Sequence, residues 1–187
     1  MSNISIIIHT IIFPILALGL FTVLFLFGIG LFTFDAPFIP IPRRVLPHIR
    51  KALNLQSDSI VYDLGCGDGR VLIECSKDNP TGLCIGIELA QIPYSLARLY
   101  IFLKHRRNII IQKQNLYTTD LSQATHIFAY LLPKALPALE NKLAREARQG
   151  LRVVTCDFKL PTKTPSESYQ IPGPKHGLGK TIYIYTY

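Results

Sequence analysis

The protein has 187 residues, 49% of them hydrophobic, and its 20 Lys and Arg outnumber its 12 Asp and Glu to give a formal net charge of +8. This length is enough for one ordinary domain with a short appendage. A basic chain suits an anionic partner, either lipid or nucleic acid, although the same charge also serves a generally soluble surface.

The cysteine pattern excludes a structural metal site. Cys66, Cys75, Cys84 and Cys156 form no Cys-x-x-Cys pair, and none lies near a histidine at the spacing of metal ligands. Cys84 and Cys156 fall within apolar runs, where a free thiol packs as a small hydrophobic side chain. We therefore expect free thiols, a reducing compartment and no metal.

The N-terminal segment predicts a membrane anchor. Residues 1–34 contain no Asp, Glu, Lys or Arg, and a hydrocarbon core of about 30 Å needs about 20 apolar residues in a helix. A cleaved signal peptide is the rival interpretation, but the segment lacks a basic start, is too long and has no A-x-A-like site. We predict a transmembrane helix near residues 11–32.

Basic residues follow this segment and predict its orientation. Arg43, Arg44, Arg50 and Lys51 crowd its C-terminal side, whereas no Lys or Arg precedes it. The positive-inside rule then places the remainder of the chain in the cytoplasm, below the inner membrane if the source is bacterial. Residues 35–58 are expected to form a proline-containing linker and a lead-in helix at 44–55.

A glycine-rich turn lies between two short apolar runs. Residues 60–64 predict a strand, the sequence Gly65-Cys-Gly-Asp-Gly69 a turn, residues 70–77 a helix, and residues 82–87 a second strand that ends at Glu88. This order is a β-α-β unit of the kind that binds nucleotides.

The spacing of the glycines favours S-adenosylmethionine over a dinucleotide. Dinucleotide loops read G-x-G-x-x-G, whereas here Arg70 occupies the place of the third glycine. Asp63 lies two positions before the first glycine, where its carboxylate would repel a pyrophosphate but suits the cationic methionine end of S-adenosylmethionine. Glu88 ends the second strand, about 20 residues beyond the turn, where an acid accepts hydrogen bonds from ribose hydroxyls.

The alternation of helices and strands continues to the C-terminus. We expect helices at 93–107 and 136–148, and strands at 108–113, 125–131, 151–157 and 181–187. Asn115 and Leu116 follow the third strand, at the point where this fold commonly borders an adenine. The basic run 104–107 is interpreted as a solvated end of its helix rather than a ligand site.

Three segments resemble a known family: Pro37-Phe-Ile-Pro40, Asp63-Leu-Gly-Cys-Gly-Asp-Gly-Arg70 and Gly86-Ile-Glu88. They are similar to the membrane-anchored protein-lysine methyltransferases, whose mitochondrial members act on the ATP synthase c subunit and the adenine nucleotide translocase. The similarity covers residues 33–187. It implies an α/β, Rossmann-like, seven-strand class I methyltransferase fold over residues 59–187, after one N-terminal transmembrane helix at residues 1–34.

The resemblance also implies which residues bind S-adenosyl-L-methionine. The motif positions and the resemblance together give twelve candidate cofactor-binding residues: Asp63, Gly65, Cys66, Gly67, Asp68, Gly69, Glu88, Leu89, Asn115, Leu116, Pro37 and Phe38. The Pro37–Pro40 stretch is either a cover for the cofactor or a spacer. Two departures stand out: Cys66 replaces the usual serine, and the chain lacks the tryptophan that the family carries after the Leu-Pro at positions 160–161.

The acceptor side of the site is less explicit. Tyr130, Asp120 and Asp157 are candidates to line the mouth of the crevice, and none is assigned as a base. The predicted acceptor is a lysine of a membrane protein, with the lipid bilayer as a second partner. A lipid or quinone acceptor, RNA, and a non-catalytic S-adenosylmethionine-binding module remain as alternatives, although nucleic acid is not the partner that we expect.

Overall fold

The computed structural model describes residues 8–32, 38–173 and 177–187, and for residue 8 and residues 26–32 it describes the backbone alone. The chain forms two compact units, residues 1–38 and residues 39–187.

The first unit is built around one apolar helix. The π-helical turn η1 (Ile8–Ile12) leads into α2 (Phe13–Phe32), and the large apolar side chains from Ile11 to Phe25 are all exposed. Judged on the described residues alone, no helix has both the length and the hydropathy that a membrane span requires. The span predicted near residues 11–32 therefore remains a prediction.

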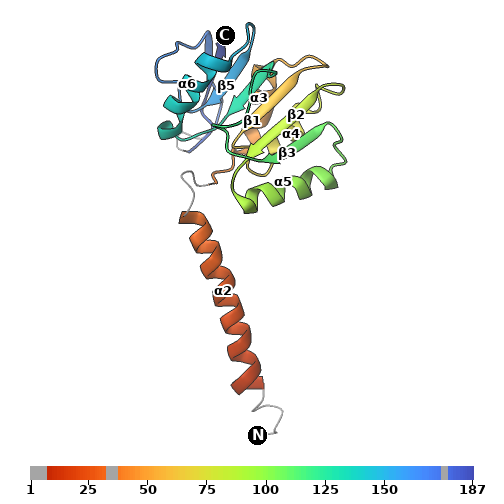
Figure 1. Ribbon diagram of the computed structural model, residues 1–187, viewed down its shortest axis with the longest axis vertical. Coiled ribbons are helices and arrows are strands. Elements are labelled where there is room, and N and C mark those ends of the chain that lie inside the picture. The colour runs from red at the N-terminus through yellow and green to blue at the C-terminus, as the bar shows by residue number, and fades with distance from the viewer. Residues whose placement is uncertain (1–7, 33–37, 174–176) are drawn as a thin grey trace. The chain divides into compact units, whose positions relative to one another are not determined.

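The second unit is built on one seven-stranded sheet (Figure 1). Its strands lie in the order β3-β2-β1-β4-β5-β7-β6, and β7 runs antiparallel to both of its neighbours. The strands are β1 (Ile60–Leu64), β2 (Leu83–Glu88), β3 (Ile109–Lys113), β4 (His126–Ala129), β5 (Arg152–Cys156), β6 (Glu167–Gln170) and β7 (Thr181–Thr186). This is the Rossmann-like, seven-stranded α/β sheet that the family resemblance implies.

Helices cover both faces of the sheet. Val61 of β1 belongs to a core shared with α3 (Leu46–Leu53), α4 (Arg70–Cys75) and α5 (Gln91–Leu103). Tyr62 and Leu64 of the same strand belong to a second core, shared with α6 (Leu136–Glu146). Successive side chains of a strand point to opposite faces, and β1, β2, β4, β5 and β7 accordingly contribute to both cores.

The lead-in helix is part of the second unit. The turn η2 (Arg43–Val45) precedes α3, whose Ile49 and Leu53 are fully buried. Arg152 Nε of β5 donates a 2.7 Å hydrogen bond to the carbonyl oxygen of Ala52. Of residues 35–58, which were expected to form a linker and a lead-in helix, residues 39–58 belong to the same unit as the strands.

The predicted elements agree closely with the observed ones in the parallel half of the sheet. The expected strand at 60–64 matches β1, and the others begin or end within two residues of their predicted limits. The helix predicted to reach residue 107 ends at Leu103, because His105 adopts a left-handed backbone with φ of 50°. Strand β6 was not predicted, since it is short, exposed and without an apolar repeat.

Candidate active site

The glycine turn lies at the point where the strand order reverses. Strand β1 pairs with β2 on one side and with β4 on the other. In open α/β sheets, ligands bind at this switch point, outside the carboxyl ends of the strands. Asp63, the turn 65–69 and Glu88 all lie at these carboxyl ends.

The turn adopts a backbone that side chains disfavour. Gly65, Gly67 and Gly69 have φ of 77°, 57° and 76°, all in the left-handed region that glycine adopts at little cost. The amides of Gly65 and Cys66 both donate to the carbonyl oxygen of Ile87, at 2.9 and 3.1 Å. The end of β2 therefore fixes the turn, and its backbone can approach a ligand closely.

Glu88 links the end of β2 to the turn. Its Oε2 accepts a 3.0 Å hydrogen bond from the Gly67 amide, and its Oε1 accepts a 2.8 Å bond from the Ala90 amide. Partial burial raises the pKa of this carboxyl, against the lowering effect of the backbone hydrogen bonds. An ionised carboxylate has about four acceptor positions, so capacity remains for a pair of hydroxyl groups.

Asp63 is a buried carboxyl with an unsatisfied oxygen. The residue is 2% exposed, and its Oδ2 has no hydrogen-bond partner among the described residues. Burial, followed by the charges of Glu88 and Asp68, raises the pKa of Asp63 well above its usual value. Leaving a buried acceptor unpaired is costly, and a cationic ligand group would offset that cost.

Asp68 has a protein partner. Arg70 Nε donates to both of its carboxylate oxygens, at 2.8 and 3.0 Å, and Arg70 Nη1 donates to the carbonyl oxygen of Ile41 at 2.9 Å. The pair thus connects the turn to the segment that enters α3. Sequence reasoning missed this role of Arg70, although its position directly after the last glycine could have suggested it.

Gly86 and Leu131 complete the packing around the turn. A Cβ on Gly86 would lie 2.7 Å from Cys66 Sγ and 2.6 Å from Ile111 Cδ1, so only glycine fits there. The side chain of Leu131 would meet a Cβ on Gly65 at 3.1 Å. A glycine inside a strand often marks such a close approach, whereas nothing in the sequence singles out Leu131.

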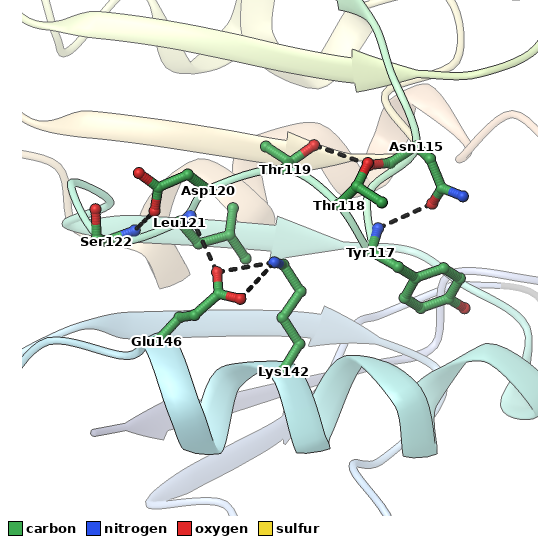
Figure 2. A network of polar contacts seen from close by, with 9 residues as sticks. All are labelled: Asn115, Tyr117, Thr118, Thr119, Asp120, Leu121, Ser122, Lys142 and Glu146. Atoms are coloured by element: carbon green, nitrogen blue, oxygen red, sulfur yellow. Dashed lines mark hydrogen bonds and ion pairs between the residues drawn. The ribbon is translucent and has the colours of Figure 1, made fainter.

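The loop after β3 places Asn115 near the carboxyl ends of the strands (Figure 2), and Leu116 follows it in the chain. Asn115 Oδ1 accepts a 2.9 Å hydrogen bond from the Tyr117 amide, and the Asn115 carbonyl accepts from the hydroxyls of Thr118 and Thr119 at 3.1 and 3.0 Å. Asn115 is exposed and Leu116 is half-buried against the core. The loop is therefore ordered by its own hydrogen bonds.

The structure does not bring Asp120 to this place. Figure 2 shows it at the far end of the same loop, beside Ser122, whose amide donates to Asp120 Oδ1 at 2.9 Å. The amide of Leu121, which lies between Asp120 and Ser122 in the chain, donates to Glu146 at the end of α6. The hydrogen bonds from Ser122 lower the pKa of Asp120, which serves as a turn cap on the surface.

Tyr130 and Asp157 are brought together. They follow β4 and β5, and Tyr130 Oη donates to Asp157 Oδ2 at 3.3 Å. The Asp157 carboxylate also accepts 2.7 Å hydrogen bonds from the amides of Gly179 and Lys180. Burial and the charge of Asp157 raise the pKa of Tyr130, so its hydroxyl is protonated at neutral pH and can donate but not act as a base.

The remaining predicted contacts are only partly described. Pro37 lies outside the described residues, and Phe38, 41% exposed, belongs to the first unit. Leu89 directly follows Glu88 and is 50% exposed, so it can contact a ligand bound there. Within the described ranges, no three His, Cys, Asp or Glu side chains gather as a metal site would require.

Comparison with known proteins decides the family. The family model described as the ANTKMT methyltransferase domain matches residues 63–167, which run from the buried Asp63 to the start of β6. The chain belongs to the ANTKMT methyltransferase family. This placement agrees with the seven-stranded sheet and with the resemblance found in the sequence.

Two relatives of this ANTKMT-family chain differ in the share of their own length that aligns with it. A protein-lysine N-methyltransferase of Saccharolobus islandicus is 32% identical over 151 residues, 80% of this chain and 92% of that protein. The human lysine N-methyltransferase of the ATP synthase c subunit is 29% identical over 69% of this chain. Only 54% of the human protein is matched, so the chain spans about half of it.

A solved structure supports the choice of methyl donor. An RNA methyltransferase of Salinibacter ruber, in complex with S-adenosyl-L-homocysteine, superposes with a TM-score of 0.72 at 26% identity, over 79% of this chain and 93% of that one. S-adenosylmethionine fits the site described here, because Asp63 offers an unpaired acceptor to a cationic group and Glu88 offers acceptors to hydroxyls.

We expect Glu88→Gln and Asp63→Asn to weaken binding of S-adenosylhomocysteine at least tenfold. A hydrogen bond to a charged group contributes about 1.5–3 kcal/mol, and about 1.4 kcal/mol is tenfold in affinity. Calorimetric titration measures the effect, with Asp58→Asn as the control, since Asp58 is an exposed acid before β1. Undiminished affinity in both site variants would remove these residues from the cofactor site.

We expect Asp63→Asn to stabilise the ligand-free protein at neutral pH. Because the pKa of Asp63 is raised on folding, its contribution to stability is present below the unfolded pKa of about 3.9 and is lost as pH rises through the folded pKa. Asparagine does not ionise, so the variant does not lose stability as the pH rises. Its advantage in the free energy of unfolding should shrink toward pH 4, as urea titrations would show. A difference that does not change with pH would contradict the raised pKa.

Proposed function

We propose that the protein transfers the methyl group of S-adenosylmethionine to a lysine side chain of a membrane protein. The observation that carries this proposal is the match to the lysine methyltransferase of Saccharolobus islandicus, which spans 92% of that protein and includes the glycine turn. The name of the human relative, which refers to the c subunit of ATP synthase, supports a membrane protein as the substrate.

The residues of the site have to hold two reactants in line. The donor supplies a methyl group already activated by its sulfonium, so the protein contributes alignment more than chemistry. Asp63 holds the cationic end of the donor, Glu88 holds its ribose, and the turn 65–69 closes against it. The lysine nitrogen attacks the methyl carbon as the carbon–sulfur bond breaks, and S-adenosylhomocysteine leaves.

The acceptor must arrive as a neutral amine. With an unperturbed pKa of about 10.4, deprotonating a lysine at pH 7 costs about 4.6 kcal/mol. Desolvation at the mouth of the crevice lowers that cost. Tyr130 lies at this edge and can accept a hydrogen bond from the amine through its oxygen while it donates to Asp157 at 3.3 Å.

RNA is a second candidate for the acceptor. The solved structure from Salinibacter ruber is called an RNA methyltransferase, and the net charge of +8 would attract nucleic acid. Against RNA, the end of β4 continues as Tyr130-Leu-Leu-Pro133 and carries no Asn/Asp-Pro-Pro-Tyr motif, which is typical of enzymes that methylate the amino groups of bases.

Residues 11–32 are proposed to anchor the protein in a membrane, with the second unit on the cytoplasmic side. Residues 1–34 contain no Asp, Glu, Lys or Arg, and Arg43, Arg44, Arg50 and Lys51 follow them. A hydrocarbon core of about 30 Å needs about 20 apolar residues in a helix, fewer than this segment offers. The positive-inside rule supports the cytoplasmic orientation.

Transfer to a lysine is tested with labelled donor. Incubation of the protein with methyl-labelled S-adenosylmethionine and membranes from cells that lack it should place the label in one or a few membrane proteins. Mass spectrometry should then locate a methylated lysine, and Glu88→Gln should abolish the label. Label in extracted lipid or quinone, or in RNA, would contradict a lysine acceptor and identify that class of molecule as the acceptor instead. No label in any fraction would favour a module that binds S-adenosylmethionine without catalysis.

The anchor makes its own prediction. Extraction with alkaline carbonate should leave the full chain in the membrane pellet, because this treatment releases proteins that are bound only by charge. Protease added to the cytoplasmic side should digest the second unit, whereas protease on the opposite side should not. Release of the chain into the supernatant would contradict the membrane anchor, and it would leave the proposed lysine acceptor unaffected.

A further inference from the structure

Helix α5 is apolar on the side that faces solvent as well as on the side that faces the sheet. Its buried residues, Pro93, Ala97 and Ile101, recur every four positions and form one stripe. At about 100° per residue, a second apolar stripe lies roughly opposite to it. This second stripe consists of Ile92, Leu99, Phe102 and Leu103, which are 46%, 51%, 73% and 58% exposed.

The surroundings of this stripe are strongly basic. No Asp or Glu occurs between Glu88 and Asp120, whereas five Lys and Arg fall in the same interval: Arg98, Lys104, Arg106, Arg107 and Lys113. Arg106 and Arg107, with His105, Ile101 and Phe102, line an open depression of about 240 Å³ at the end of the helix. Basic and apolar groups therefore share one surface.

We define the α5 outer face as Ile92, Leu99, Phe102, Leu103, Arg106 and Arg107, and we propose that it rests on the surface of an anionic lipid bilayer. The apolar side chains would enter the boundary between headgroups and acyl chains, and the two arginines would contact lipid phosphates. This arrangement is that of an interfacial amphipathic helix. All six residues belong to the second unit, so the contact depends neither on the methyl acceptor nor on helix α2.

The combination of side chains is what selects lipid as the partner. Leu99, Phe102 and Leu103 are neighbours on the helix surface at spacings of three and four residues, and an exposed apolar patch on a soluble domain marks an interaction surface. A nucleic acid would be met by cations and by aromatic rings that stack on bases, whereas Ile92, Leu99 and Leu103 can do neither. An anionic membrane satisfies both components, because each Lys or Arg near its surface adds to the attraction.

A single tryptophan can report this contact, because the chain contains none. Phe102→Trp should fold normally, since the side chain is exposed. With the full chain reconstituted in vesicles of phosphatidylcholine and phosphatidylserine, its fluorescence should shift to the blue and be quenched by brominated lipid. Leu99→Trp should behave in the same way. Ala144→Trp, on the exposed side of α6, should show neither effect.

Charge reversal provides the matched test. In the Phe102→Trp protein, Arg106→Glu with Arg107→Glu should abolish the quenching, whereas Arg145→Glu with Arg148→Glu, an equal change of charge at the end of α6, should leave it. Quenching that is equal at positions 102 and 144, absent at both, or unchanged in vesicles of phosphatidylcholine alone would overturn the proposal. A blue shift with RNA instead of vesicles would also overturn it.

Discussion

The second unit is arranged around the Asp63 carboxyl group, one oxygen of which has no hydrogen-bond partner in the described part of the chain. Asp63 lies in β1 between Gly86 of β2 and Phe128 of β4, at the centre of the parallel strands. Its Oδ2 is buried and has no partner among the described residues, so the fold carries a cost that a cationic ligand removes. The left-handed glycines, the absence of a side chain at Gly86 and the close packing of Cys66 surround this carboxylate with few side-chain atoms, and Gly65 leaves the start of the turn exposed.

Much of this region could be predicted from the sequence, for a physical reason. Parallel strands are covered on both faces, so they occur as short, mostly apolar runs. Residues 60–64 and 82–87 are such runs, broken only by Asp63 and by Gly82 and Gly86. A carboxylate at the end of a parallel strand must lie at the ligand-binding edge. Asp63 and Glu88 could therefore be placed without knowledge of the rest of the fold.

The parts that were missed depend on contacts between distant residues. Strand β6 lies at the edge of the sheet and shows no apolar alternation, so only its pairing with β7 defines it. The sequence of the loop after β3 does not indicate that Asp120 lies away from the carboxyl ends of the strands. Asp157 was expected to line the crevice, yet its carboxylate mainly holds the backbone at Gly179 and Lys180, a role that requires the loop between β6 and β7 to return to β5.

The four cysteines are all free and buried, and burial raises the pKa of every one of them. Since the thiolate is the form that reacts, these thiols are inert while the chain is folded. Cys66 differs from the others because it lies within the glycine turn itself. Its rate of alkylation by a small uncharged reagent therefore measures how often that turn opens, whereas Cys75 and Cys84 measure opening of the core. A bound nucleoside would slow the alkylation of Cys66 but not that of Cys75 or Cys84. The native thiols therefore report local opening of the glycine turn separately from opening of the core.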